Sequence, residues 1–129
     1  MRWLRFSTGG GEPVYGTLDG ETVTEVSGTP FGDHAPAGRT HALADVKIEV
    51  PVIPPTFYCV GLNYAEHIRG AAAKLGIEPN LPTQPDVGYR GPAALIADGE
   101  DVVIPPDAEK VQYEGELCVV IGREARHLS

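Results

Sequence analysis

The chain has 129 residues, which is enough for one compact domain or for a small domain plus part of another. Hydrophobic residues make up 42% and charged residues 22%, values typical of a globular protein and not of a disordered one. The formal net charge of −8 repels the phosphates of nucleic acids and anionic membrane surfaces, so neither is expected as a partner.

Residues 1 to about 28 are predicted to form a small β-meander. Arg2 to Phe6 alternates in hydrophobicity, Val14 to Leu18 follows a glycine-rich loop, and Glu21 to Val26 follows Asp19-Gly20. Asp-Gly between alternating segments is a strong hairpin signal, because both turn positions need a positive φ angle. The start of the chain lacks the apolar run of a signal peptide and no window approaches a membrane span, so a cytoplasmic location is expected.

The next segment, residues 29–46, is predicted to be loop and linker, because it has prolines, glycines and little periodicity. Its histidines, His34 and His41, are interpreted as solvated loop residues. Strands are expected at Val46 to Val52 and at the apolar run Phe57 to Val60. These features divide the chain into a small N-terminal β domain with its linker, residues 1–50, and a second domain that begins in residues 51–129.

A helix is predicted after Gly61-Leu-Asn63, with Asn63 as its N-cap and Gly76 at its end. Its apolar positions follow helical spacing and form one stripe, made of Tyr64, Ile68, Ala71 and Leu75. His67 lies at the edge of this stripe, near the start of the helix. A loop with three prolines then leads to a short strand, Val87–Arg90, and the Asp98-Gly99 turn precedes a strand at Asp101–Ile104.

The last predicted strand, Val111–Ile121, carries two acidic side chains on one face. Glu114 and Glu116 are two residues apart and therefore roughly 6.6 Å apart along a strand. A hard divalent cation would remove the repulsion between them and gain oxygen ligands. Spacing alone leaves the alternative open that they are ordinary glutamates at a solvated strand end. Cys59 and Cys118 lie in apolar runs and are expected to be buried free thiols.

Three motifs in order resemble the fumarylacetoacetate hydrolase family. They are Phe57-Tyr-Cys-Val-Gly-Leu-Asn-Tyr-Ala-Glu-His67, the Gly- and Pro-bounded stretch from Gly91 to Pro105, and Tyr113-Glu-Gly-Glu-Leu-Cys-Val-Val-Ile-Gly122. The opening hairpins resemble the small N-terminal domain of many members. The implied fold is α+β and mostly β: a small N-terminal β-meander followed by the first part of a mixed β-roll, truncated or split.

The resemblance also implies a metal site and roles for single residues. Mg²⁺ or Mn²⁺ is expected at Glu114 and Glu116, with a third carboxylate ligand outside this chain. His67 matches the catalytic histidine that activates water or moves a proton. Arg90 is expected to contact a substrate carboxylate, and Asn63 and Tyr64 are further candidates for substrate binding.

Two positions depart from the pattern of the family. Members acting as hydrolases or decarboxylases often carry Glu three residues after the histidine, where this chain has Gly70. Glu66 points roughly 100° away from His67 on a helix and is a poor substitute. Water activation by a His–Glu pair is therefore not expected, which leaves isomerase or hydratase chemistry more open than hydrolysis or decarboxylation. Val60 stands where the hydrolase that names the family has an extra aspartate ligand, so a smaller three-carboxylate site is expected.

The resemblance implies a catabolic, usually dimeric, metal-dependent enzyme: a hydrolase, lyase or isomerase. Its substrates would be small 2-oxo acids, β-diketo acids or unsaturated dicarboxylates, converted by C–C hydrolysis, decarboxylation, isomerisation or hydration through a metal-bound enolate. We expect a complementary chain to complete the β-roll, and the complete unit to form a homodimer. The alternative is a degenerate, non-catalytic module of the same fold that binds a partner chain or a ligand.

Overall fold

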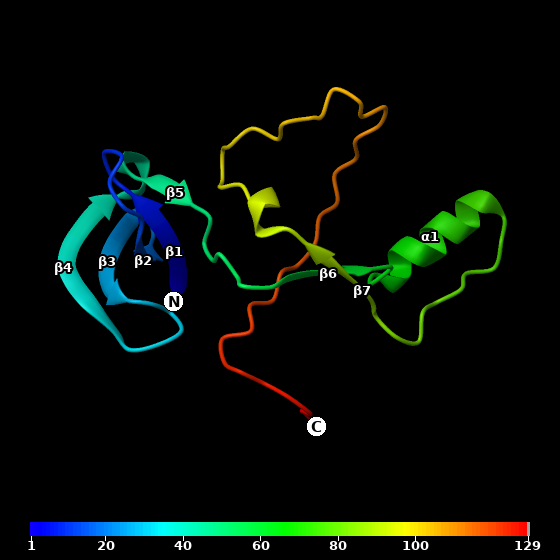
Figure 1. Ribbon diagram of the computed structural model, residues 1–129, viewed down its shortest axis with the longest axis horizontal. Helices are drawn as coiled ribbons and strands as arrows, with labels where there is room; N and C mark the ends of the chain where they lie inside the picture. Colours follow the sequence, from blue (N-terminus) through cyan, green and yellow to red (C-terminus); the bar gives the residue numbers. More distant parts are fainter. Residues whose placement is uncertain (129) are drawn as a thin grey trace. The chain divides into compact units, whose positions relative to one another are not determined.

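The computed structural model describes residues 1–128, which form two structural units (Figure 1). One comprises Met1–Val52 together with the chain from Ile96 onward, and the other comprises Ile53–Leu95. Within residues 1–128, strands predominate over one α-helix, and the strands pair antiparallel. The predicted fold class, α+β and mostly β, is confirmed.

The first unit contains a five-stranded antiparallel sheet in the order β4-β3-β2-β1-β5. Its strands are β1 (Arg2–Ser7), β2 (Val14–Asp19), β3 (Thr22–Gly28), β4 (His34–Ala42) and β5 (Lys47–Glu49). A 3₁₀ turn, η1 (Leu43–Asp45), connects the last two strands. The predicted meander of the first three strands is confirmed, and Figure 1 shows β4 and β5 at the two edges of the sheet.

The turn between β2 and β3 is centred one residue later than the sequence pattern predicts. Asp19 pairs with Thr22, so the two loop residues are Gly20 and Glu21. Only Gly20 has a positive φ, +54°. Glycine at the first loop position is the requirement of a type II′ turn, which suits the twist of a β-hairpin.

The prediction of loop for residues 29–46 is wrong, because His34–Ala42 forms β4. This strand pairs only with β3 and lies at the edge of the sheet, with nearly all of its residues exposed. An exposed edge strand needs no hydrophobic alternation and tolerates Pro36, so its sequence resembles a loop. The two histidines in it make contacts: His34 packs edge-on against Trp3, and His41 against Phe6.

The core of this sheet is small and depends on one glycine. Leu4, Phe6 and Val23 are buried together. A Cβ atom at Gly16 would lie 2.8 Å from the Phe6 ring and 2.9 Å from the Thr24 carbonyl oxygen. Real Cβ atoms essentially never come so close to other heavy atoms, so the absence of a side chain at Gly16 makes room for the Phe6 ring.

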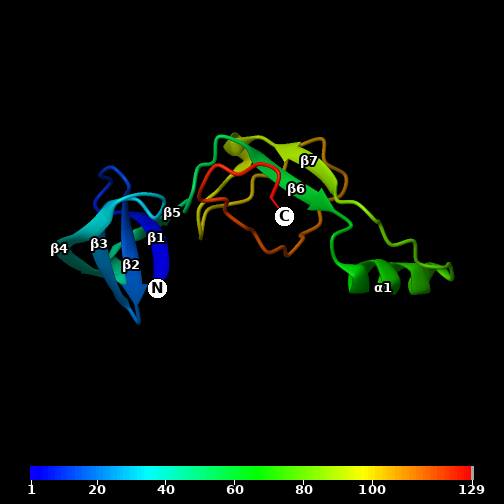
Figure 2. The same cartoon turned by 90° about the horizontal axis from the view of Figure 1, so that it is seen from below.

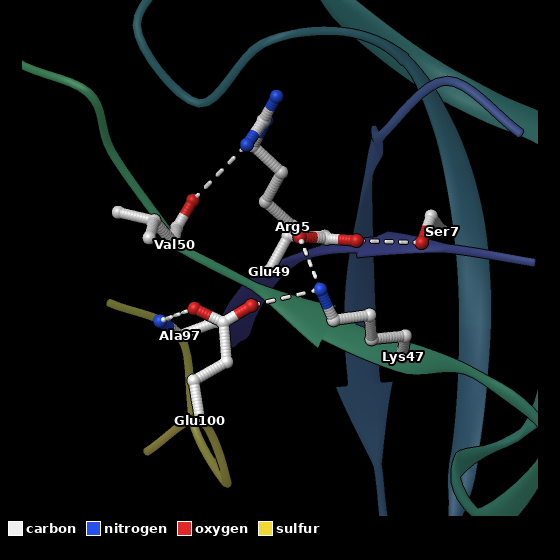
Figure 3. Close-up of polar contacts among 7 residues, drawn as sticks. All are labelled: Arg5, Ser7, Lys47, Glu49, Val50, Ala97 and Glu100. Carbon is white, nitrogen blue, oxygen red and sulfur yellow. Dashed lines mark hydrogen bonds and ion pairs between the residues drawn. The ribbon is translucent and has the colours of Figure 1, made fainter. Parts of the chain in front are cut away.

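The edge strand β5 carries a network of polar contacts (Figure 3). Lys47 Nζ lies 2.8 Å from Glu100 Oε1 and 3.5 Å from Glu49 Oε2. Ser7 Oγ donates to Glu49 Oε1 at 2.6 Å, and the Ala97 N–H donates to Glu100 Oε2 at 2.9 Å. The bond from Lys47 lowers the pKa of Glu100, and the bond to Glu100 raises the pKa of Lys47. Charged side chains thus cover the edge of β5, which discourages pairing with another chain.

The second unit contains a two-stranded antiparallel sheet and the helix, which lies in the connection between the two strands (Figure 2). Its elements are β6 (Phe57–Gly61), α1 (Ala65–Leu75), β7 (Asp86–Arg90) and the 3₁₀ turn η2 (Pro92–Ala94). Gly76 caps α1 in the left-handed conformation with φ +67°, as predicted. Asn63 is not the N-cap: Tyr64 occupies that position, without a side-chain capping bond. Tyr64 instead accepts the Ile68 N–H through its carbonyl at 3.2 Å.

The predicted strands Asp101–Ile104 and Val111–Ile121 are absent from the described structure, where residues 101–128 form neither helix nor strand. A strand needs backbone partners along its edge, and the two sheets of the described chain offer none to this segment. Its alternating apolar side chains are exposed, for example Leu117 at 84% and Val119 at 77%. Cys118 is also exposed, contrary to prediction, whereas Cys59 is half-buried; both thiols are free. Of the helices described, none has the length and apolarity to cross a bilayer.

Candidate active site

One face of the two-stranded β6–β7 sheet carries Arg90, the predicted carboxylate contact. Alternate strand residues share a face, so Arg90, Gly88 and Asp86 lie together, directly opposite residues 57, 59 and 61 of β6. Arg90 is exposed and its Nη1 lies 3.4 Å from the Tyr89 carbonyl oxygen. Gly88 leaves room for the neighbouring thiol, because a Cβ there would lie 3.1 Å from Cys59 Sγ.

The first turn of α1 carries His67, the predicted proton-transfer residue. His67 is the third residue of the helix and its side chain is exposed. The chain enters the helix through Leu62, a non-glycine residue with φ +51°, followed by Asn63 and Tyr64. Backbone in this region costs energy for an L-residue, and such outliers concentrate at functional sites. Asn63 and Tyr64 therefore lie on the short connection between β6 and α1, and His67 follows in the first turn of the helix.

A groove of about 430 Å³ lies between the start of α1 and the proline-rich loop that precedes β7. Asn63 lines it, whereas His67 does not. Its walls come from β6 and its turn, from α1 and from the loop, and comprise Gly61, Leu62, Asn63, Ala65, Ile68 and Leu81–Pro85. The volume is in the range of small-molecule sites.

Gly70 lies three residues after His67 and is therefore its neighbour on the helix surface. No heavy atom outside the local backbone comes within 4 Å of the position that a Cβ at Gly70 would take. The space is open, so packing does not demand glycine here. Because the residue has no side chain, position 70 supplies no carboxylate to orient His67.

Glu114 and Glu116 lie in the irregular part of the first unit, and both are exposed. Their carboxylates are oxygen donors of the kind that Mg²⁺ and Mn²⁺ prefer. Within residues 1–128, no group of three or more His, Cys, Asp or Glu side chains is arranged to hold a metal ion. The two glutamates thus have suitable chemistry for part of a metal site, and the third carboxylate ligand stays a prediction.

The structure groups Asn63, Tyr64, His67 and Arg90 in the second unit, and leaves the two glutamates in the first. Sequence reasoning missed three polar residues beside the first group: Thr83 and Gln84, which line the groove, and Asp86, at the start of β7. Asp86 and Arg90 are four residues apart, and this even spacing was the signal that would have placed them on one face of a strand.

Two family models match the chain. The model described as "Rv2993c-like, N-terminal" matches residues 1–51, and the model described as "Fumarylacetoacetate (FAA) hydrolase C-terminal" matches residues 56–129. Together they account for nearly all of the sequence.

Curated relatives agree with these matches. "Protein Rv2993c" of Mycobacterium tuberculosis is 34% identical over 88% of this chain and 43% of its own length. The "Homoprotocatechuate catabolism bifunctional isomerase/decarboxylase" of Escherichia coli is 40% identical over 57% of this chain and 16% of its own length. The "Oxaloacetate tautomerase YisK" of Bacillus subtilis is 32% identical over 69% of this chain and 29% of its own length. This chain thus spans less than half of each of these relatives.

Two solved structures are also similar to this chain. An uncharacterised protein from Mycobacterium abscessus matches with a TM-score of 0.66 and 30% identity, over 84% of this chain and 40% of that one. The 2-hydroxyhepta-2,4-diene-1,7-dioate isomerase of Mycobacterium marinum matches with a TM-score of 0.56 and 25% identity, over 74% of this chain and 34% of that one. Both matches extend over most of the described chain.

Proposed function

Because this chain belongs to the fumarylacetoacetate hydrolase family, we propose that it forms part of a metal-dependent enzyme that interconverts the keto and enol forms, or isomers, of a small 2-oxo acid. Related members are named as isomerases, decarboxylases and tautomerases. The proposal concerns the complete catalytic domain, since the chain spans less than half of these relatives. A homodimer of that complete unit and a cytoplasmic location stay predictions.

The observation that carries this choice of reaction is Gly70. Hydrolysis of a C–C bond needs an activated water molecule, for which the histidine is paired with a glutamate three residues later in many members of the family. Gly70 leaves His67 without that carboxylate. Moving a proton between C3 of a 2-oxo acid and its enol oxygen requires a single acid–base group and no water, so His67 alone is sufficient.

The chemistry is divided among few residues. Glu114 and Glu116 would hold Mg²⁺ or Mn²⁺, which supplies positive charge where negative charge develops on the enolate oxygen. His67 removes the proton from C3 and delivers it to the enol oxygen, or moves it in the opposite direction. The Arg90 guanidinium binds the carboxylate of the substrate and fixes its orientation.

Replacement of a proposed metal ligand in the complete catalytic domain tests the proposal. Glu116→Ala should abolish metal-dependent tautomerisation, measured as the loss of enol absorbance of a 2-oxo acid. Glu124→Ala, which removes another exposed glutamate of the same segment, is the matched control and should keep the activity. Full activity of the Glu116 variant in the presence of a chelator would refute the proposal.

A further inference from the structure

The segment that carries Glu114 and Glu116 contacts the N-terminal sheet at two places. One contact comes before the two glutamates in the sequence, at residues 97–100, and the other comes after them, at residues 120–122. Sheet and segment belong to the same structural unit. The two glutamates therefore lie on a stretch of chain that one sheet contacts at both ends.

The first contact joins a tight turn to the edge strand β5. The Glu100 N–H donates to the Ala97 carbonyl oxygen at 3.2 Å, and the Ala97 N–H donates to Glu100 Oε2 at 2.9 Å. The other carboxylate oxygen of Glu100 accepts from Lys47 Nζ on β5 at 2.8 Å (Figure 3). An exposed ion pair alone contributes little. Here the same carboxylate also closes the turn, and Ala97 within the turn is buried, so the turn has a defined place on the sheet.

The second contact is an apolar pocket on the face of the sheet that carries Trp3 and Tyr15. The two rings lie edge to face, with centroids 6.5 Å apart. Phe31, from the loop after β3, and Val120 also line this pocket of about 190 Å³. A Cβ at Gly122 would lie 3.6 Å from Phe31 Cδ1, an ordinary van der Waals distance. Residues 120–122 thus lie against a group of aromatic side chains, which offer a large apolar contact area.

This pocket is better suited to packing of the chain than to a free ligand. Its volume is below the range of small-molecule sites. None of the described residues that line it carries a formal charge, so it has no ionic group with which to orient a substrate. Val120 is itself part of the wall, so the aromatic residues already have the C-terminal segment as their neighbour.

We propose that the N-terminal sheet is a docking surface for residues 97–122 and thereby positions Glu114 and Glu116, with Phe31 and Lys47 as positioning residues. Its value for metal binding rests on the proposed function, in which the two glutamates are metal ligands. A segment held at both ends has fewer conformations, so its carboxylates lose less entropy when a cation gathers them. The sheet thus tightens metal binding without contributing a ligand.

The double variant Phe31→Ala/Lys47→Gln, made in the protein with its complete catalytic domain, tests this proposal. Amide hydrogen exchange of residues 97–100 and 118–122, followed by mass spectrometry without metal, should become faster. The dissociation constant for Mn²⁺, measured without substrate, should rise roughly two- to tenfold, the cost of ordering one more side chain on binding. The matched control Phe31→Tyr/Lys47→Arg keeps the ring and the charge and should resemble the parent in both measurements.

Glu100→Gln provides a second variant that leaves the sheet itself unchanged. It weakens the ion pair from the side of the segment and should also speed exchange at residues 97–100. Unchanged exchange in both variants would overturn the docking surface. Faster exchange with unchanged Mn²⁺ affinity would overturn the positioning role. A parent protein that binds no Mn²⁺ would refute the metal site of the proposed function, and faster exchange in the variants would then still support the docking surface.

Discussion

His67 and Arg90 have different proposed tasks, which kinetics can separate. His67 moves the proton in the transition state, so His67→Ala should lower kcat by roughly 10²- to 10⁴-fold and leave metal affinity unchanged. Arg90 holds the carboxylate in the ground state and the transition state alike, so Arg90→Ala should mainly raise KM. Steady-state kinetics and a Mn²⁺ titration of each variant are the measurements. The reverse pattern would show that the two roles are misassigned.

Glu25 makes the stability of the N-terminal sheet depend on pH. Its carboxylate is buried on β3, accepts a hydrogen bond from Arg39 Nη2 and lies 3.5 Å from His41 Nε2. The bond from Arg39 lowers the pKa of Glu25; burial opposes this effect and His41 adds to it. The charged form therefore stabilises the fold at pH values above the ordinary pKa of 4.5, and this stabilisation is lost as the pH falls through the lower, folded-state pKa.

Replacing Glu25 with glutamine should remove this dependence. At neutral pH the variant should unfold at lower urea concentration than the parent chain, and the difference should shrink as the pH is lowered below 4.5. Glu12→Gln, at an exposed loop glutamate, is the control. If the urea midpoints of the variant and the parent chain differed by the same amount at neutral pH and at about pH 3, the charge of Glu25 would contribute nothing to the pH dependence of stability.

At the residue scale, the sequence predicted which side chains carry the proposed chemistry, but it could not predict all of the contacts around other residues. His67 and Arg90 followed from the motifs, because a motif fixes residue types and spacing. The contact between Glu25 and His41 could not be predicted, because it joins two strands, one of which was interpreted as a loop. Pairing across strands depends on register, and register between β3 and β4 shifts between Thr24 and Val26.

Helices and strands with strong local sequence patterns were predictable, and strands that depend on pairing with a distant segment were not. The helix at Ala65–Leu75 has periodicity and a glycine cap, and the first three strands have alternation and turns. Edge strand β4 lacks alternation because both of its faces are exposed. The segment Val111–Ile121 has alternation but lacks a partner strand in the described structure, so pattern alone was insufficient.

Packing of Phe6 against β2 makes Gly16 a sensitive position in the sheet. Gly16→Ala places a methyl group 2.8 Å from the Phe6 ring and 2.9 Å from a backbone oxygen, so the sheet must deform. We expect a loss of about 1–3 kcal/mol in the free energy of unfolding, measured by urea denaturation. Gly91→Ala, where a Cβ would meet no atom within 4 Å, is the control. Equal stability of the two variants would contradict the packing argument.

In the whole molecule, the residues that carry the proposed chemistry lie in two different structural units. Proton transfer and carboxylate binding belong to residues 53–95, and the two proposed metal ligands lie in the chain after Ile96. The alternating side chains of 111–121 remain exposed in the described structure. We expect this segment to become a strand when the remainder of a complete β-roll supplies a partner edge, which would bring the ligands to the substrate.

The exchange of C3 protons tests the central claim most directly. A 2-oxo acid in D₂O exchanges its C3 protons each time it passes through the enol, and ¹H NMR follows the loss of their signal. With the complete catalytic domain and Mg²⁺, exchange should be accelerated, and a chelator or the Glu116→Ala change should return it to the uncatalysed rate. Acceleration that persists unchanged in the chelator and in that variant would contradict a metal-dependent enolising enzyme.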